Sequence, residues 1–181
     1  MIAFFGAPGS GKSLQGQLLA ARHDWRWLST GQILRDSKDK QILAKIKDGK
    51  ILTDDVMFPL VKKAVVEAGD IERLVLDGFP RTAAQVRWLL DDKNELGRQL
   101  KLVIYINVSE DELDRRLNLR GRADDSKSER EYRQKIFKNQ LEPIIELFEQ
   151  SKVPVMRVDG DGSVGEVHDR IEEILESCTL V

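Results

Sequence analysis

Cysteine, histidine and long apolar runs are scarce in this sequence of 181 residues. The single cysteine, Cys178, excludes an intramolecular disulfide and a zinc site built from four cysteines. The two histidines, His23 and His168, lack the spacing of metal ligands, so we expect both to lie at the surface. No apolar run approaches the roughly 18 residues of a membrane-spanning helix, and the start lacks the basic region of a signal peptide. We therefore expect a cytoplasmic protein with no membrane partner.

A strong excess of one charge is also lacking, because 29 basic and 31 acidic residues give a net charge of −2. We therefore expect no nucleic-acid partner, since proteins that bind nucleic acids usually carry a basic surface. The segment 115–138 is an exception, because its nine basic and four acidic residues give a local charge of +5. This segment either faces a negatively charged ligand or forms a solvated surface, and composition leaves both interpretations open.

Short apolar segments rich in Val, Ile and aromatic residues alternate with longer segments of helical periodicity. The pattern predicts strands at residues 2–5, 25–29, 73–77, 102–108 and 153–158. It predicts helices at residues 12–22, 82–90, 110–119, 129–150 and 164–176. Ser109 followed by Glu112 predicts a capping box at the start of the third of these helices.

This alternation predicts one α/β domain built on a parallel five-stranded sheet with right-handed crossovers and helices on both faces. The composition, 41% hydrophobic and 33% charged, fits a globular, helix-rich chain. Ligands of such sheets bind at the carboxyl ends of the strands, so we expect the functional residues at that edge.

Residues 6–13, GAPGSGKS, match the phosphate-binding pattern G-x-x-x-x-G-K-[ST] between a predicted strand and a predicted helix. The glycines let successive backbone N–H groups point at one anion, and the start of the helix adds its positive dipole end. Lys12 would supply a point charge for the β- and γ-phosphates, and Ser13 a hydroxyl for Mg²⁺. The alternative is a chance glycine-rich turn. The pattern predicts a nucleotide binder without identifying an enzyme.

Two further segments, 28–35 and 77–85, each follow a predicted strand and read LSTGQILR and DGFPRTAAQ. Together with residues 6–13 they resemble the nucleoside monophosphate kinase family, and adenylate kinases most closely. The family pattern D-G-F-P-R-T-x-x-Q is matched at every fixed position, and the resemblance covers essentially the whole chain. It implies a Mg²⁺-dependent enzyme that reversibly transfers the γ-phosphoryl group of ATP to AMP, giving two ADP.

The resemblance also implies a P-loop NTPase-type fold and a single kinase domain over residues 1–181. An AMP-binding flap would comprise residues 29–58 and a short lid residues 119–125, and the core would comprise residues 1–28, 59–118 and 126–181. Because two moving flaps leave little rigid surface for a partner chain, we expect a monomer.

An enzyme whose acceptor is a phosphate has to hold two polyanions close together, and arginines grip phosphates through paired hydrogen bonds. The resemblance assigns Arg35 and Arg81 to the acceptor phosphate, and Thr30 and Gln85 to the acceptor base. The glutamine amide suits a base edge because it both donates and accepts. The whole acceptor set implied is Thr30, Arg35, Lys50, Ile51, Leu52, Gly78, Phe79, Arg81, Gln85, Arg122 and Arg133. For Ile51 and Leu52, the alternative is a segment that only leads into a helix at Thr53.

Asp77 ends a predicted apolar strand, where a carboxylate is costly without a partner. The resemblance gives Asp77 a role in binding Mg²⁺ through water, together with Ser13. The alternative is a carboxylate that caps the next turn.

The resemblance implies a donor site made of Gly9, Ser10, Gly11, Lys12, Ser13, Leu14, Arg116, Arg120 and Gly162. It implies catalytic roles for Lys12, Arg81, Arg120, Arg122 and Arg133. Several cations around a transferring phosphoryl group would stabilise its spread negative charge. The alternatives are an ion-paired helix surface for the arginines of the lid and a plain turn for Gly162. A long, zinc-carrying lid is excluded where it depends on four cysteines.

The chain departs from the family pattern at three positions. Ser13 and Leu14 replace the usual Gly and Thr, and Gln32 stands where most relatives have Asp. Two other functions therefore stay open. One is a UMP/CMP kinase, although such kinases usually carry asparagine where Thr82 and Gln85 stand. The other is a nucleotide-binding regulatory homologue with weak catalysis.

Overall fold

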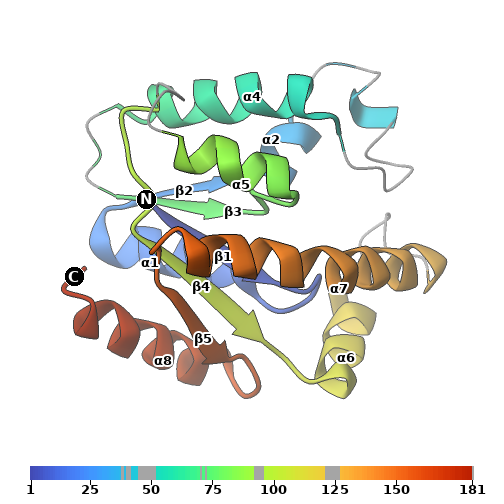
Figure 1. Ribbon diagram of the computed structural model, residues 1–181. Coiled ribbons are helices and arrows are strands. Elements are labelled where there is room, and N and C mark those ends of the chain that lie inside the picture. The colour runs from blue at the N-terminus through green and yellow to red at the C-terminus, as the bar shows by residue number, and fades with distance from the viewer. Residues whose placement is uncertain are drawn as a thin grey trace.

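Five short strands form one parallel sheet in the computed structural model, which describes residues 1–37, 39, 42–44, 52–69, 71, 73–91, 96–120 and 127–180. At residues 120, 127–134, 136, 138, 141 and 142 it describes the backbone alone. The strands are β1 (Ile2–Gly6), β2 (Arg26–Ser29), β3 (Leu74–Asp77), β4 (Leu102–Asn107) and β5 (Val155–Asp159). Their order is β2-β3-β1-β4-β5, and the predicted parallel sheet is confirmed (Figure 1).

The register of the strands brings the predicted motifs to one edge of the sheet. Asp77 at the end of β3 pairs with Ser29 at the end of β2 and with Phe4 of β1. Because the strands are parallel, the phosphate loop after Gly6 emerges at the same edge as Asp77. The carboxyl edge is therefore where the candidate site has to be assembled.

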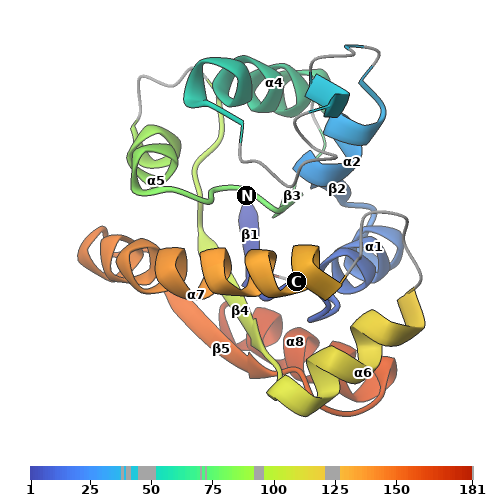
Figure 2. The ribbon, with the colours of Figure 1, turned by 90° about the vertical axis from the view of Figure 1, so that its right-hand side faces the viewer.

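Helices cover both faces of the sheet. They are α1 (Lys12–His23), α2 (Thr30–Arg35), α4 (Asp54–Glu67), α5 (Ala83–Leu90), α6 (Glu110–Arg120), α7 (Lys127–Gln150) and α8 (Val164–Ser177). Leu19 of α1 and Ile171 of α8 are fully buried in a core cluster on one face. Val65, Val86 and Phe148, from α4, α5 and α7, are buried in the cluster on the other face (Figures 1 and 2). This is the predicted two-faced α/β architecture.

Each predicted strand and helix is confirmed, with ends that differ by no more than two residues. The helix α2 had no predicted counterpart, and α4 was anticipated only as a possible helix beginning at Thr53. Only six residues form α2, too few to show a period, and Pro59 interrupts the pattern of α4. Burial of Met57, Val61 and Val65 stabilises α4 despite the proline.

The capping box predicted at Ser109 and Glu112 was wrong. The backbone N–H of Ser109 donates to Oδ1 of Asp161 at 3.0 Å, while the Glu112 carboxylate accepts hydrogen bonds from two arginines of its own helix. A capping box forms instead at the start of α8, where Ser163 and Glu166 satisfy each other's backbone N–H groups.

Aromatic stacking joins α4 to α5. The rings of Phe58 and Trp88 lie 4.6 Å apart and nearly parallel, and Phe79 packs edge-on against Trp88. This contact connects the turn after β3 to α4, whose first residues, Phe58 included, belong to the expected flap.

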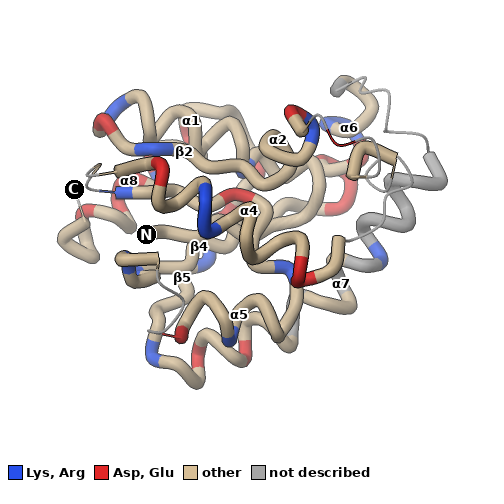
Figure 3. Tube along the Cα trace, turned by 90° about the horizontal axis from the view of Figure 1, so that it is seen from above, with Lys and Arg blue, Asp and Glu red and all other residues tan. Residues whose placement is uncertain are grey.

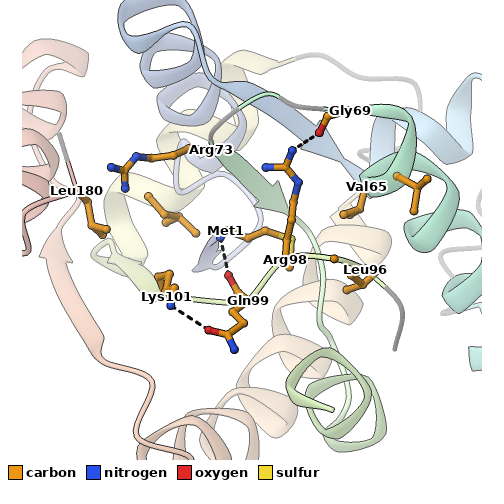
Figure 4. A pocket seen from close by; sticks show the side chains of 12 residues that line it. Met1, Val65, Gly69, Arg73, Leu96, Arg98, Gln99, Lys101 and Leu180 are labelled. Atoms are coloured by element: carbon orange, nitrogen blue, oxygen red, sulfur yellow. Dashed lines mark hydrogen bonds between the residues drawn. The ribbon is translucent and has the colours of Figure 1, made fainter. Parts of the chain in front are cut away.

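The amino edge of the sheet, opposite the motifs, holds a cavity of about 690 Å³ (Figure 4). The chain engages the cations that line it. Arg98 donates to the carbonyl oxygens of Gly69 and Ile71, Lys101 donates to Gln99, and Arg73 lies over the ring of Trp25. Among the described helices, none is long and apolar enough to cross a membrane.

Candidate active site

The phosphate loop lies between β1 and α1, as predicted. A side chain at Gly6 would place its Cβ 2.5 Å from Oγ of Ser10 and 2.6 Å from the carbonyl oxygen of Ile106. Only glycine fits this close approach, which also requires a positive φ of 149°. The loop tightens through a hydrogen bond of 3.1 Å from the Ser10 N–H to the Ala7 carbonyl, and α1 begins at Lys12. The sequence therefore folds locally into a cradle for an anion.

Lys12 lies folded against this loop. Its Nζ donates to the carbonyl oxygens of Gly6 and Ala7, each at 2.7 Å, and to Oγ of Ser10 at 3.3 Å. An ammonium group so placed can exchange carbonyl partners for phosphate oxygens within the same loop. This geometry brings the predicted point charge to the phosphate cradle.

Ser13 and Asp77 meet across the gap between α1 and β3. The hydroxyl of Ser13 donates to Oδ2 of Asp77 at 2.6 Å, and Asp77 is only 3% exposed. A hydroxyl and a carboxylate are hard oxygen donors, and Mg²⁺ in nucleotide sites is usually held by one or two such groups with waters and phosphates. In the described part of the chain, no group of three His, Cys, Asp or Glu residues could hold a metal alone. The pair thus fits a Mg²⁺ ion that arrives with a nucleotide.

The turn after β3 aims Arg81. Its Nε donates to the carbonyl oxygen of Gly78 at 2.8 Å. Gly78 has a φ of 81°, and a Cβ there would lie 2.9 Å from Oγ1 of Thr30. Thr30 is buried, and its hydroxyl donates to the backbone carbonyl of Asp77 at 3.3 Å. The expected acceptor residues Thr30, Gly78 and Arg81 are therefore brought together.

Arg35 is oriented by a neighbour on α2. Its Nη2 donates to Oε1 of Gln32 at 2.9 Å, and Nε2 of Gln32 donates to Oδ1 of Asp36 at 2.8 Å. Because the amide of Gln32 is neutral, it positions the guanidinium without cancelling its charge. The departure from the usual Asp thus leaves Arg35 able to meet an anion.

Gln85 is 1% exposed, and both ends of its amide are engaged. Its Oε1 accepts from the Arg81 N–H at 2.7 Å, and its Nε2 donates to Oδ1 of Asp54 at 2.9 Å. Leu52 is also buried in the core, and α4 begins two residues later, so this segment does lead into a helix.

Arg116 joins the phosphate loop to the loop after β5. Its Nη2 donates to the carbonyl oxygens of Gly160 and Gly162 at 2.9 and 3.2 Å, and its Nη1 donates to that of Ser10 at 3.5 Å. Its Nε donates to Glu112 at 2.6 Å. This places Arg116 and Gly162 side by side, as the donor-site expectation requires.

Glu112 accepts hydrogen bonds from Arg115 and Arg116 of the same helix, α6. Hydrogen bonds from Arg115 and Arg116 lower the pKa of Glu112 from 4.5 to about 2, because they favour the ionised carboxylate. Arg115 is largely exposed, and the partner that the structure shows for it is Glu112. Part of the basic segment is therefore neutralised locally, and Figure 3 shows basic and acidic residues interspersed over the described trace.

Comparisons with known proteins agree with this geometry. The family model described as adenylate kinase matches residues 4–153. The chain belongs to the adenylate kinase family. The adenylate kinase of Thermus thermophilus is 34% identical over 184 residues, which cover 96% of this chain and 96% of that protein. Those of Prochlorococcus marinus (strain MIT 9301) and Maricaulis maris (strain MCS10) are 32% and 34% identical, over 95% and 97% of this chain and 96% and 98% of theirs.

The resemblance drawn from the motifs is thus confirmed, and the protein is a nucleoside monophosphate kinase, a phosphotransferase. Part of its expected site lies beyond the described structure. Lys50, Ile51 and Arg122 lie outside the described residues. Arg120 and Arg133 are placed only by their backbone, on α6 and α7.

Sequence reasoning missed a polar network in this adenylate kinase family member. The expectation that both histidines lie at the surface was wrong, because the side chains of His23 and His168 are only 22% and 12% exposed. Both face Glu172, and His168 also contacts the buried Gln15. The spacing of four residues between His168 and Glu172 is a signal that the sequence carries. The sequence carries no signal for the contact of His23 with Glu172, because these two residues lie 149 positions apart.

Proposed function

We propose that this enzyme transfers the γ-phosphoryl group of Mg·ATP to AMP, giving two ADP. The contact between Ser13 and Asp77 is the observation that supports this most directly, because it joins the phosphate loop to the first residue of the acceptor segment. Two phosphate-binding segments then share one edge of the sheet, as an enzyme that joins two polyanions needs.

In this proposal the reaction needs no protein nucleophile, since a phosphate oxygen of AMP attacks the γ-phosphorus in line. Lys12 gives up its carbonyl partners to contact the β- and γ-phosphates of the donor. Arg35 and Arg81 bind the acceptor phosphate through paired hydrogen bonds. Ser13 and Asp77 would hold Mg²⁺, Asp77 through water, and the ion would neutralise charge on the donor phosphates. The protein thus accelerates the reaction by positioning the two nucleotides and by stabilising the negative charge of their phosphates.

The remaining roles follow from the family. Arg116 and Gly162 lie beside each other, and we assign them to the donor base. We assign Arg120, Arg122 and Arg133 to the transferring phosphoryl group, Lys50, Ile51, Leu52 and Phe79 to the acceptor pocket, and Thr30 and Gln85 to the acceptor base. The flap would be residues 29–58 and the lid residues 119–125, and the enzyme would act as a monomer.

A coupled assay of ADP formation tests the proposal. With ATP as donor, AMP, CMP, UMP and GMP are supplied in turn, each with Mg²⁺ and with an excess of chelator. We expect turnover with AMP that the chelator abolishes. Faster turnover with CMP or UMP would reassign the acceptor, and turnover in excess chelator would refute the role of Mg²⁺.

A further inference from the structure

Each nitrogen of the Arg116 guanidinium group contacts the protein. Nη2 donates to the carbonyl oxygens of Gly160 and Gly162 at 2.9 and 3.2 Å. Nη1 donates to that of Ser10 at 3.5 Å, and Nε donates to Oε1 of Glu112 at 2.6 Å. These four contacts use four of the five N–H groups of a guanidinium. Because the N–H groups lie in its plane, the faces of the guanidinium are what remain for a flat ring.

Glu112 differs in kind from the other partners of Arg116. The carbonyl oxygens belong to the phosphate loop and to the loop after β5, whereas Glu112 lies on α6, the helix that carries Arg116. A spacing of four residues places the two side chains on one face of that helix. Their contact joins two ionised groups, and its 2.6 Å is the shortest of the four. Glu112 therefore fixes the direction of the Arg116 side chain relative to its own helix.

The carboxylate of Glu112 is itself held in place. On its outer side it accepts two hydrogen bonds from Arg115, from Nε to Oε2 and from Nη2 to Oε1, each at 2.7 Å. The side chains of Arg116 and Glu112 are only 19% and 18% exposed, whereas that of Arg115 is largely exposed. Solvent screens a partly buried ion pair less than an exposed one. The inner pair, Glu112 with Arg116, is therefore the one that can orient a functional group.

Arg116 also lies close to the phosphate cradle. A Cβ on Gly11 would lie 4.0 Å from its Nη1, the nitrogen that faces the Ser10 carbonyl. A cation in this place could pair with the phosphates of a nucleotide as well as contact its base. The negative charge of Glu112 offsets that of Arg116, and the bond to Nε holds the guanidinium beside the loop of Gly160 and Gly162.

We propose that Glu112 is a positioning residue that holds a face of the Arg116 guanidinium toward the base of the donor nucleotide. Without this carboxylate, Arg116 would keep only its carbonyl partners and could turn toward the donor phosphates. The contribution of the base to donor affinity would then fall, while that of the phosphates would remain. The inference rests on the proposed function, since Arg116 contacts the donor base only there.

Two substitutions separate the reach of Glu112 from its charge. Glu112→Ala removes the carboxylate. Glu112→Asp keeps the charge, but its side chain is one methylene shorter, so the carboxylate falls short of Nε of Arg116. Asp114→Ala is the matched control for charge, because Asp114 is an exposed acid of the same helix. Arg115→Ala is the control for the stability of α6, because it removes the other ion pair of Glu112 and leaves the contact with Arg116.

Calorimetry at about pH 7, where carboxylates are ionised, would measure the affinities for ATP and for inorganic tripolyphosphate, which lacks the base. The ratio of the two affinities reports the contribution of the base. We expect this ratio to fall about 3- to 10-fold in Glu112→Ala and in Glu112→Asp, the effect of about one hydrogen bond. Asp114→Ala and Arg115→Ala should keep the wild-type ratio. Partial unfolding weakens the binding of both ligands alike, so a merely structural role would leave the ratio unchanged.

A wild-type ratio in Glu112→Ala would overturn the positioning role. A wild-type ratio in Glu112→Asp would do so as well, since charge alone would then suffice, and so would an equal fall in either control. A wild type that forms ADP from ATP and AMP but binds ATP no more tightly than tripolyphosphate would overturn this inference and leave the reaction standing. Failure of the wild type to bind ATP would overturn the proposed function, and this inference with it.

Discussion

Nε2 of Gln85 donates a hydrogen bond to Oδ1 of Asp54, 2.9 Å away, and thereby ties the start of α5 to the start of α4. Asp54 lies within the expected acceptor flap, and Gln85 belongs to the segment after β3. In this structure the amide that we assign to the acceptor base is bound to the protein itself. To form a hydrogen bond with the acceptor base, Gln85 would have to give up its bond with Asp54 or with the backbone N–H of Arg81.

We expect AMP to be the preferred acceptor. AMP should exceed CMP and UMP by about 10- to 100-fold in kcat/KM, because a buried amide left without its partner costs roughly 1–3 kcal/mol. Gln85→Leu should shrink this preference and leave the KM for ATP near that of the wild type. Steady-state kinetics with each monophosphate measures both.

Asp54→Asn is the matched control for Gln85→Leu, because it keeps an oxygen that can accept from Gln85 while removing the charge. It should retain the preference for AMP. Unchanged selectivity in Gln85→Leu would mean that other residues recognise the base. An equal loss of the preference for AMP in both variants would mean that Gln85 acts by positioning the flap through Asp54.

Lys12→Ala should lower kcat/KM by about 100- to 1,000-fold or more, because the developing charge on the phosphates loses its nearest cation. Arg115→Ala is the control, since this exposed cation pairs with Glu112 and should leave kcat/KM near the wild-type value. A Lys12→Ala enzyme within tenfold of the wild type would refute the role of this lysine.

The contact of Ser13 with Asp77 predicts the response to metal. Asp77→Asn and Ser13→Ala should both raise the Mg²⁺ concentration needed for half-maximal activity, because the first removes the negative charge of the carboxylate and the second removes the hydroxyl oxygen. Ser13→Thr keeps the hydroxyl and should restore the wild-type requirement. Titration of activity with Mg²⁺ would decide this, and identical curves for all four proteins would count against a metal role.

Glu112 predicts a dependence of stability on pH. The pKa of Glu112 falls from 4.5 to about 2 in the folded protein. Its contribution to the free energy of unfolding is therefore fully present above pH 4.5 and is lost as the pH falls through about 2. Glu112→Gln should therefore be less stable than the wild type at pH 6, and the difference should narrow at pH 3. Urea unfolding at the two pH values measures it. A difference that widens on acidification would contradict this assignment.

Two adenosines joined by five phosphates should bind more tightly than ATP. The molecule spans the donor and acceptor sites, so its second half binds at a high effective concentration. Calorimetry gives the affinity, and Arg81→Ala should weaken binding of this compound far more than binding of ATP. An affinity no better than that of ATP would mean that no second nucleotide site exists.

The sequence predicts the features that depend on local periodicity or on dense motifs. Strands buried on both faces read as apolar runs, and the phosphate loop carries its glycines at fixed spacing, so both could be placed to within two residues. What could not be predicted depends on competition between partners. Ser109 has Glu112 nearby in sequence, but Asp161 reaches its N–H, and two arginines occupy Glu112.

Long-range polar contacts were likewise beyond sequence reasoning. Glu172 on α8 contacts His23 on α1, a helix near the other end of the chain, and the packing of α1 against α8 brings the two residues together. The extent of α4 across Pro59 depends on the burial of Met57, Val61 and Val65, which the sequence does not show. For the acceptor base, the motif named Gln85 but could not show that Asp54 already holds its amide.

The stack of Trp88 on Phe58 gives the enzyme a built-in optical reporter. The other two tryptophans, Trp25 and Trp27, belong to the β2 side of the sheet, in the core cluster away from α4. Replacing both by phenylalanine would leave Trp88 as the only tryptophan, which can be excited selectively over the two tyrosines. Its emission would change if nucleotide binding altered the packing of α4 on α5, so stopped-flow fluorescence could time that rearrangement without any attached dye.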